Sequence, residues 1–193
     1  MIFFQIVGGQ LTQPGEFPFS VLIGNIEKRY IGTLPGGKKL FSELENWVCS
    51  GVLLNSHFVL TAAHCINPDD GSIKLKLGVH RINGYGPNEN GNHGTSSENY
   101  QTFDIPSENF VKHENFTMEK NSVRNDIALI KLPRPVQMNR QTQPVCWKKQ
   151  ASHTMNENLV VVGWGKTNAS QTSANKINGL YSTDQYKLEV KSF

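Results

Sequence analysis

Hydrophobic and polar residues alternate along two parts of this chain. In the segment 72–79, apolar side chains occupy every second position, with serine, lysine or glycine between them. The segment 187–191 repeats the pattern, with Leu188 and Val190 set between charged residues. A period of two is typical of a β-strand with one buried face. Both segments are therefore predicted to be half-buried strands.

Further strands are predicted from short apolar runs, and no segment between them shows a helical stripe. These runs are 19–23, 48–54, 58–60, 127–132 and 159–162. Three connections, 24–46, 83–104 and 166–185, are dense in Gly, Asn, Ser, Thr and charge, and we expect them to be long loops. Many short strands with turn residues between them predict an all-β sandwich or barrel.

Prolines suggest how the chain is divided. Pro133, Pro135 and Pro144 mark an expected linker around 133–147. It separates a larger first unit from a much shorter second one. The sequence contains no internal repeat and no low-complexity tract.

Composition narrows the class of protein. With 193 residues, 37% of them hydrophobic and 18% charged, the chain suits a soluble globular protein with a real core. A formal net charge of +3 is too small to indicate nucleic-acid binding. No apolar run approaches the roughly 18–20 residues of a membrane span, so no membrane role is expected. The apolar start at 1–4 is too short for a signal peptide.

The cysteines and two short motifs favour an oxidising, extracellular setting. Cys49 and Cys65 flank a predicted strand–turn–strand unit, so their side chains could meet, which leaves Cys146 over. Asn115 and Asn168 each begin an Asn-x-Ser/Thr sequence, the acceptor pattern for N-glycosylation. We therefore expect a secreted glycoprotein.

Four separated stretches identify a family. They are I-V-G-G at 6–9, T-A-A-H-C at 61–65, N-D-I-A-L-I at 125–130 and G-W-G at 163–165. Their identity and order resemble the chymotrypsin-like (trypsin-type) serine proteases, over nearly the whole chain from 6 to about 190. The residues around these stretches are most similar to those of trypsin-like proteases of arthropod haemolymph cascades.

The resemblance implies a fold and a domain division. Members of this family are chymotrypsin-like double β-barrels. Here the first barrel is expected to be complete over 6–140, and the linker with a partial second barrel to cover 141–193. Residues 1–5 lie outside the family pattern. Because so little of the second barrel is recognisable, we expect residues 150–193 to be poorly anchored.

The resemblance also implies a catalytic pair. Imidazole suits the role of base because its pKa lies near neutrality, and a carboxylate holds its tautomer. By resemblance, His64 is the general base and Asp126 its orienting carboxylate. The alternative for Asp126 is a turn-forming aspartate before a strand. A serine endopeptidase of this kind acts on protein or peptide substrates, and no cofactor is expected.

Three further residues take roles from the family pattern. Cys49 and Cys65 match the disulfide that clamps the histidine loop. Cys146 matches a position that often bonds to a light chain or propeptide, the alternative being a lone buried thiol. Ile6 corresponds to the new N-terminus that activation creates.

A metal site is not predicted. The six histidines are scattered, and neither an H-E-x-x-H pattern nor a paired C-x-x-C pattern occurs.

The chain departs from the family at two places. Gln5 precedes Ile6, where family members carry Arg or Lys, and no G-D-S-G-G-P segment, which holds the nucleophile, occurs. Ser50, Ser96 and Ser97 do not substitute for it. We expect a serine endopeptidase domain whose sequence is incomplete, so that this chain is inactive as given. The alternatives are a non-catalytic serine protease homologue that acts as a binding or regulatory module, and a short isoform.

Overall fold

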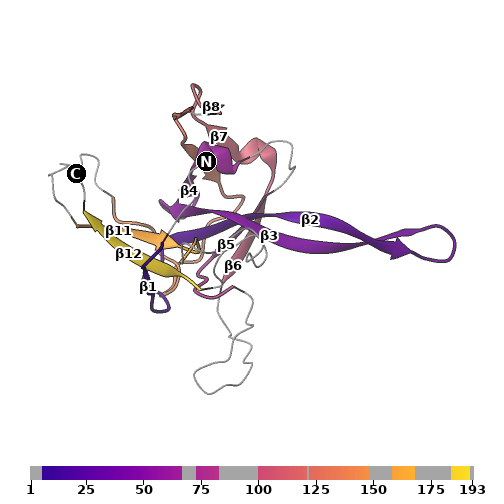
Figure 1. Cartoon of the computed structure of the whole chain (residues 1–193), viewed down its shortest axis with the longest axis horizontal. Helices are drawn as coiled ribbons and strands as arrows, with labels where there is room; N and C mark the ends of the chain where they lie inside the picture. Colours follow the sequence, from indigo (N-terminus) through magenta and orange to yellow (C-terminus); the bar gives the residue numbers. More distant parts are fainter. Residues whose placement is uncertain are drawn as a thin grey trace, which may run out of the picture.

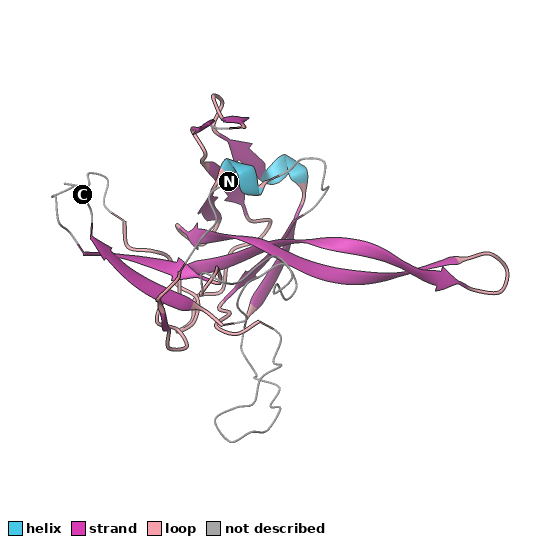
Figure 2. Cartoon of the chain, viewed as in Figure 1, coloured by secondary structure: helices cyan, strands magenta, loops and turns pink. Residues whose placement is uncertain are grey.

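The computed structural model describes residues 6–66, 73–82, 100–120, 122–147, 158–167 and 184–191, without the side chains of 27, 43, 44 and 191. Its ordered elements are almost all strands, which confirms the predicted all-β class (Figure 2). In chain order they are β1 (Gln10–Leu11), β2 (Ser20–Thr33), β3 (Lys39–Leu53), β4 (Phe58–Thr61), the 3-10 turn η1 (Ala63–Cys65), β5 (Ile73–Leu77), β6 (Gln101–Ile105), η3 (Ser107–Asn109), β7 (Phe110–Lys112), β8 (Thr117–Glu119), β9 (Ser122–Arg124), β10 (Ala128–Lys131), β11 (Asn158–Gly163) and β12 (Tyr186–Lys191).

The strands form two main sheets and a small hairpin. A curled seven-stranded antiparallel sheet has the order β6-β5-β2-β3-β4-β10-β7 (Figure 1). A three-stranded sheet joins β1, β12 and β11, and β8 pairs with β9. β1 therefore lies in the same sheet as the last strand of the chain, although almost the full length of the sequence separates them.

The interior of the large sheet follows the predicted alternation. Ile73, Leu75 and Leu77 of β5 are buried, whereas Lys74 and Lys76 between them form ion pairs with Glu45. The apolar side chains join one core cluster with residues from β2, β3, β4, β6 and β10. Burying such side chains is the main favourable contribution to folding, at roughly 1.5–3 kcal/mol for each large one. The half-buried strand predicted over 72–79 is confirmed, and β5 forms over 73–77.

The expected loop at 24–46 is wrong. These residues belong to the two longest strands, β2 and β3, which pair from Ser20↔Val52 to Thr33↔Lys39. Only 34–38 form the turn, where Gly36 and Gly37 adopt the left-handed φ angles of 97° and 83° that glycine tolerates best. The outer part of this hairpin is exposed on both faces, so no buried face produces a period-two pattern there. Part of the second expected loop is likewise a strand, β6, and residues 83–99 lie outside the described residues.

Segments late in the chain contact the first unit. Trp164 is 2% exposed, and its indole N–H donates to the His80 carbonyl oxygen over 3.2 Å. The Thr12 hydroxyl donates to the Gln185 backbone carbonyl, and the Lys187 ammonium donates to the Glu16 carboxylate. The described parts of 150–193 are therefore held by packing and by polar contacts. Whether this segment is nicked first by a protease stays a prediction.

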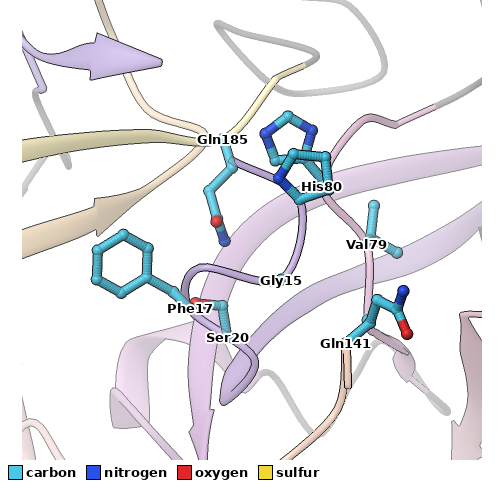
Figure 3. Close-up of a pocket in the computed structure, with 9 residues that line it drawn as sticks. Gly15, Phe17, Ser20, Val79, His80, Gln141 and Gln185 are labelled. Carbon is cyan, nitrogen blue, oxygen red and sulfur yellow. The ribbon is translucent and has the colours of Figure 1, made fainter. Parts of the chain in front are cut away.

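A small cavity of about 110 Å³ lies where the start of β2 meets the residues after β5. Figure 3 shows Phe17, Ser20 and Gln185 around it. The Ser20 hydroxyl is buried there without a hydrogen-bond partner among the described residues. None of the described helical segments is long and apolar enough to cross a membrane.

Candidate active site

His64 lies on a short turn that is held in place by one hydrogen bond and one disulfide. β4 ends at Thr61, whose hydroxyl donates to the Ser50 carbonyl of β3 over 2.9 Å. The single turn η1 follows, and a disulfide joins its last residue, Cys65, to Cys49 of β3. This disulfide is the pairing that the family resemblance implied. The backbone on both sides of His64 is therefore fixed to the central strands of the sheet.

Asp126 is placed by an unusual residue before it and by the strand after it. Asn125 has a φ of 53°, in the left-handed region that asparagine visits more readily than most residues. Its side-chain amide donates to the Asn115 carbonyl over 2.8 Å, which holds this conformation. Sequence reasoning assigned no role to Asn125, although its position directly before the candidate Asp126 was the available signal.

Strand register brings the two residues together. β10 pairs with β4 so that Ala128 lies opposite Thr61. Because the strands are antiparallel, the residues just before β10 meet those just after β4. Asp126 therefore reaches His64, although 62 residues separate them along the chain.

The carboxylate of Asp126 contacts His64 with both oxygens. His64 Nδ1 lies 2.6 Å from Oδ2, and the His64 backbone N–H donates to Oδ1 over 2.9 Å. A carboxylate can only accept hydrogen bonds, so Nδ1 carries the proton and Nε2 holds a lone pair when the ring is neutral. The two side chains are 26% and 15% exposed, which leaves the ring reachable and the carboxylate mostly covered. In this arrangement Nε2 is able to accept a proton while Asp126 orients the ring.

The other ring nitrogen faces sulfur. Cys65 Sγ lies 3.6 Å from His64 Nε2, and this sulfur is bonded in the disulfide, so it has no proton to give. No hydroxyl of the described residues hydrogen-bonds to Nε2. Ser96 and Ser97 lie outside the described residues.

The pKa of Asp126 is lowered below its ordinary value. Burial by itself raises this pKa, but the hydrogen bonds from the backbone and side chain of His64 stabilise the carboxylate and outweigh it. The His64 ring, when protonated, adds Coulombic attraction in the same direction. The carboxylate therefore stays ionised in the folded protein to a lower pH than in the unfolded chain.

The lowered pKa predicts a pH dependence of stability. A carboxylate whose folded pKa lies below its unfolded value stabilises the fold fully above the unfolded pKa, about 3.9, and this contribution is lost as the pH falls through the folded value. We expect the difference in unfolding free energy between wild type and Asp126→Asn to be largest at neutral pH. It should shrink below about pH 4. Urea unfolding across this range measures it, and a difference that does not change with pH would contradict the assignment.

An apolar cavity of about 350 Å³ lies beside the pair. It is partly open to solvent, and β3, β4, the residues just before β10, β11 and Trp164 border it. An apolar side chain or segment would fit this space better than a charged group. Its lining residues are Phe19, Ser20, Ser50, Gly51, Val52, Leu60, Thr61, Ala62, Asp126, Ile127, Val162 and Trp164.

The same region offers donor atoms that do not suit a metal. Atoms of Cys49, His64 and Cys65 lie within 4.8 Å of one another. Metal-binding cysteines are thiolates, whereas both of these sulfur atoms are bonded to each other. The geometry therefore fits a clamped histidine.

The structure locates the remaining predicted residues apart from this pair. Ile6 is fully buried, and its backbone N–H donates to the Lys166 carbonyl over 2.6 Å. Cys146 is a free, exposed thiol, so the alternative of a lone buried thiol is wrong. Asn115 is exposed, and Asn168 lies outside the described residues.

Comparison with known proteins decides the family. The model of the family described as Trypsin matches residues 6–187, most of the chain.

The chain belongs to the trypsin family.

Relatives of this trypsin-family domain include several insect proteins. It is 33% identical to phenoloxidase-activating factor 3 of Holotrichia diomphalia over 90% of the chain, and 32% identical to the Spaetzle-processing enzyme of Drosophila melanogaster over 90% of the chain. It spans 46% and 42% of the lengths of these two relatives. A solved structure described as "Structure of GrC" matches 96% of the chain with a TM-score of 0.65 at 24% identity and covers 65% of that structure, which supports the chymotrypsin-like fold.

Proposed function

We propose that this trypsin-family domain is a serine endopeptidase domain with His64 as general base and Asp126 as its orienting acid. The observation that carries the proposal is the 2.6 Å contact between His64 Nδ1 and Asp126 Oδ2. Its substrates are proteins or peptides, and its chemistry requires no cofactor.

The chemistry follows from the hydrogen bonds of the pair. Nε2 accepts the proton of a serine hydroxyl as its oxygen bonds to the substrate carbonyl carbon, and the imidazolium then gives that proton to the leaving amine. Asp126 stabilises the imidazolium and holds the ring through Nδ1, which leaves Nε2 as the nitrogen that accepts the proton. The hydroxyl has to come from a segment such as G-D-S-G-G-P, which the 193 residues do not contain. We therefore propose that this polypeptide by itself does not hydrolyse peptides.

A serine-directed probe tests this proposal. We expect a fluorophosphonate probe to leave purified 1–193 unlabelled, because no activated serine is present to attack the phosphorus. Active bovine trypsin in the same mixture serves as the positive control for the probe. Labelling of a single serine of the 193-residue chain, mapped by mass spectrometry, would overturn the proposal.

The transcript beyond Phe193 separates the enzyme from its alternatives. An in-frame continuation into G-D-S-G-G-P supports the endopeptidase, and the same frame with another residue in place of the serine supports a non-catalytic homologue. An immediate stop supports a short isoform.

We also propose an extracellular location, with a glycan on Asn115 and a disulfide from Cys146 to a propeptide or light chain. The exposure of Asn115 and the free thiol of Cys146 support these two proposals. Peptide mapping of the unreduced protein from its natural source would detect both the glycan and the disulfide. Unmodified Asn115 and an unpaired Cys146 there would contradict them.

A further inference from the structure

The outer parts of β2 and β3 project from the body of the molecule as a two-stranded ribbon (Figure 1). β5 pairs with β2 only as far as Asn25, and β4 pairs with β3 only from Val52. Over residues 26–46, the described strands therefore pair with each other alone. We refer to 26–46 as the β2–β3 ribbon.

The ribbon exposes large apolar side chains near its tip. Tyr30 and Phe41 are directly opposite each other, 53% and 52% exposed, with their rings 5.9 Å apart at 69°. Ile31 and Leu34 are exposed close by. Scattered exposed apolar residues are ordinary, but a paired aromatic group with two apolar neighbours on a projecting element indicates a contact surface.

The tip is strongly basic. Lys28, Arg29, Lys38 and Lys39 are all exposed, and the segment 28–42 contains no Asp or Glu. Its formal charge of +4 exceeds the net charge of +3 of the whole chain. Lys39 and Phe41 lie on one face of β3, because alternate residues of a strand share a face. The tip therefore complements a partner that offers both carboxylates and apolar groups.

The two edges of the ribbon differ. On β2, the pairing shifts between Tyr30 and Gly32, so that Ile31 is a bulge, and a bulge interrupts the edge of a strand. On β3, the run 39–47 pairs without a bulged residue of its own. Its outward N–H and C=O groups form a regular row that another extended chain can pair with. In a membrane interior these groups would stay unsatisfied, which is strongly unfavourable.

We propose that the β2–β3 ribbon binds an extended acidic segment of a partner protein, which pairs with the edge 39–42 of β3, the part of the strand before Glu43 and Glu45. Carboxylates of the partner lie against Lys38 and Lys39, and an apolar side chain of the partner packs on Phe41. The proposal concerns binding alone and does not depend on the catalytic role of His64.

A fluorescent peptide of five Glu-Val repeats tests the proposal, with its binding to the 193-residue chain followed by fluorescence anisotropy at low ionic strength. We expect Lys38→Glu/Lys39→Glu to bind it at least about tenfold more weakly, because two attractions become repulsions. Lys120→Glu/Arg124→Glu is the matched control, since both variants change the net charge from +3 to −1 (two cations become two anions, a change of −4). It should bind within about twofold of wild type. Equal weakening by both variants, or by neither, would overturn the proposal.

Two further probes separate strand pairing from simple charge attraction. A peptide of five Glu-Pro repeats has the same charge but lacks half of the backbone N–H donors, and we expect it to bind at least about tenfold more weakly. Equal binding of the two peptides would overturn the strand-pairing part.

Vesicles of phosphatidylcholine and phosphatidylserine test a membrane partner. Binding of the vesicles that Lys38→Glu/Lys39→Glu abolishes, without binding of the peptide, would show that the partner is a membrane and overturn the proposal.

Discussion

Asp126→Asn should lower kcat by about 10⁴-fold in a longer chain that carries residues 1–193 and continues into a G-D-S-G-G-P segment. The asparagine side chain can turn its amide toward His64 Nδ1, and a donor there favours the wrong ring tautomer. Nε2 would then carry the proton and could not accept one from the serine. The negative charge that stabilises the imidazolium in the transition state would be lost as well.

Steady-state hydrolysis of a peptide substrate measures this effect, with Asp104→Asn as the matched control. Asp104 is also an aspartate, but its side chain is 70% exposed and its ion pair is with Lys74, away from His64. The control should keep kcat within about twofold, because a single exposed ion pair contributes little. An Asp126→Asn enzyme that keeps more than a tenth of wild-type kcat would contradict the assigned role.

Replacing both Cys49 and Cys65 by serine should reduce the unfolding free energy by about 3 kcal/mol. The disulfide closes a loop with a sequence separation of 16 residues, and removing it lets the unfolded chain gain the entropy of that loop. The same change frees the turn that carries His64, because Cys65 is its neighbour.

Urea unfolding of 1–193 measures the loss, and Cys146→Ser is the control. Cys146 is exposed and free, so its replacement should change the unfolding free energy by less than about 0.5 kcal/mol. A matching NMR titration of His64 shows whether its contact with Asp126 survives. Equal stability of the double variant and wild type would contradict the structural role given to the disulfide.

The strands that could be predicted from the sequence are those with at least one buried face. β5 is an example, since its apolar residues alternate with lysines that form ion pairs on the other face. The outer part of β2 and β3 has no buried face, so its residues resemble those of a loop. Its strand structure comes from hydrogen bonds between the two strands of the hairpin, and the residue pattern of a single strand does not reveal such pairing. β6 was missed for a different reason: it is only five residues long, and its two buried side chains, Phe103 and Ile105, follow a long polar segment and are too few to show an alternating pattern.

The candidate pair was predictable because its residues lie in short recognisable stretches. T-A-A-H-C and N-D-I-A-L-I named His64 and Asp126, and the disulfide from Cys49 to Cys65 followed from the same resemblance. The left-handed conformation of Asn125 was not predicted, because it depends on an amide contact to Asn115, ten residues away. The sequence also left undecided whether Cys146 is exposed, because a single residue beside an apolar neighbour indicates neither burial nor exposure.

The sequence by itself determined the class of fold and the family, and it singled out His64 and Asp126 as the proposed base and acid, because these depend on residue types in local patterns. Only the tertiary structure decided how they meet. Antiparallel pairing of β10 with β4 places Ala128 opposite Thr61, and that register brings Asp126 to 2.6 Å from His64. The same holds for the β2–β3 ribbon, whose basic and aromatic residues form one surface only because the two strands pair across the turn at 34–38. Register between strands depends on hydrogen bonds between distant segments, and no local pattern contains it.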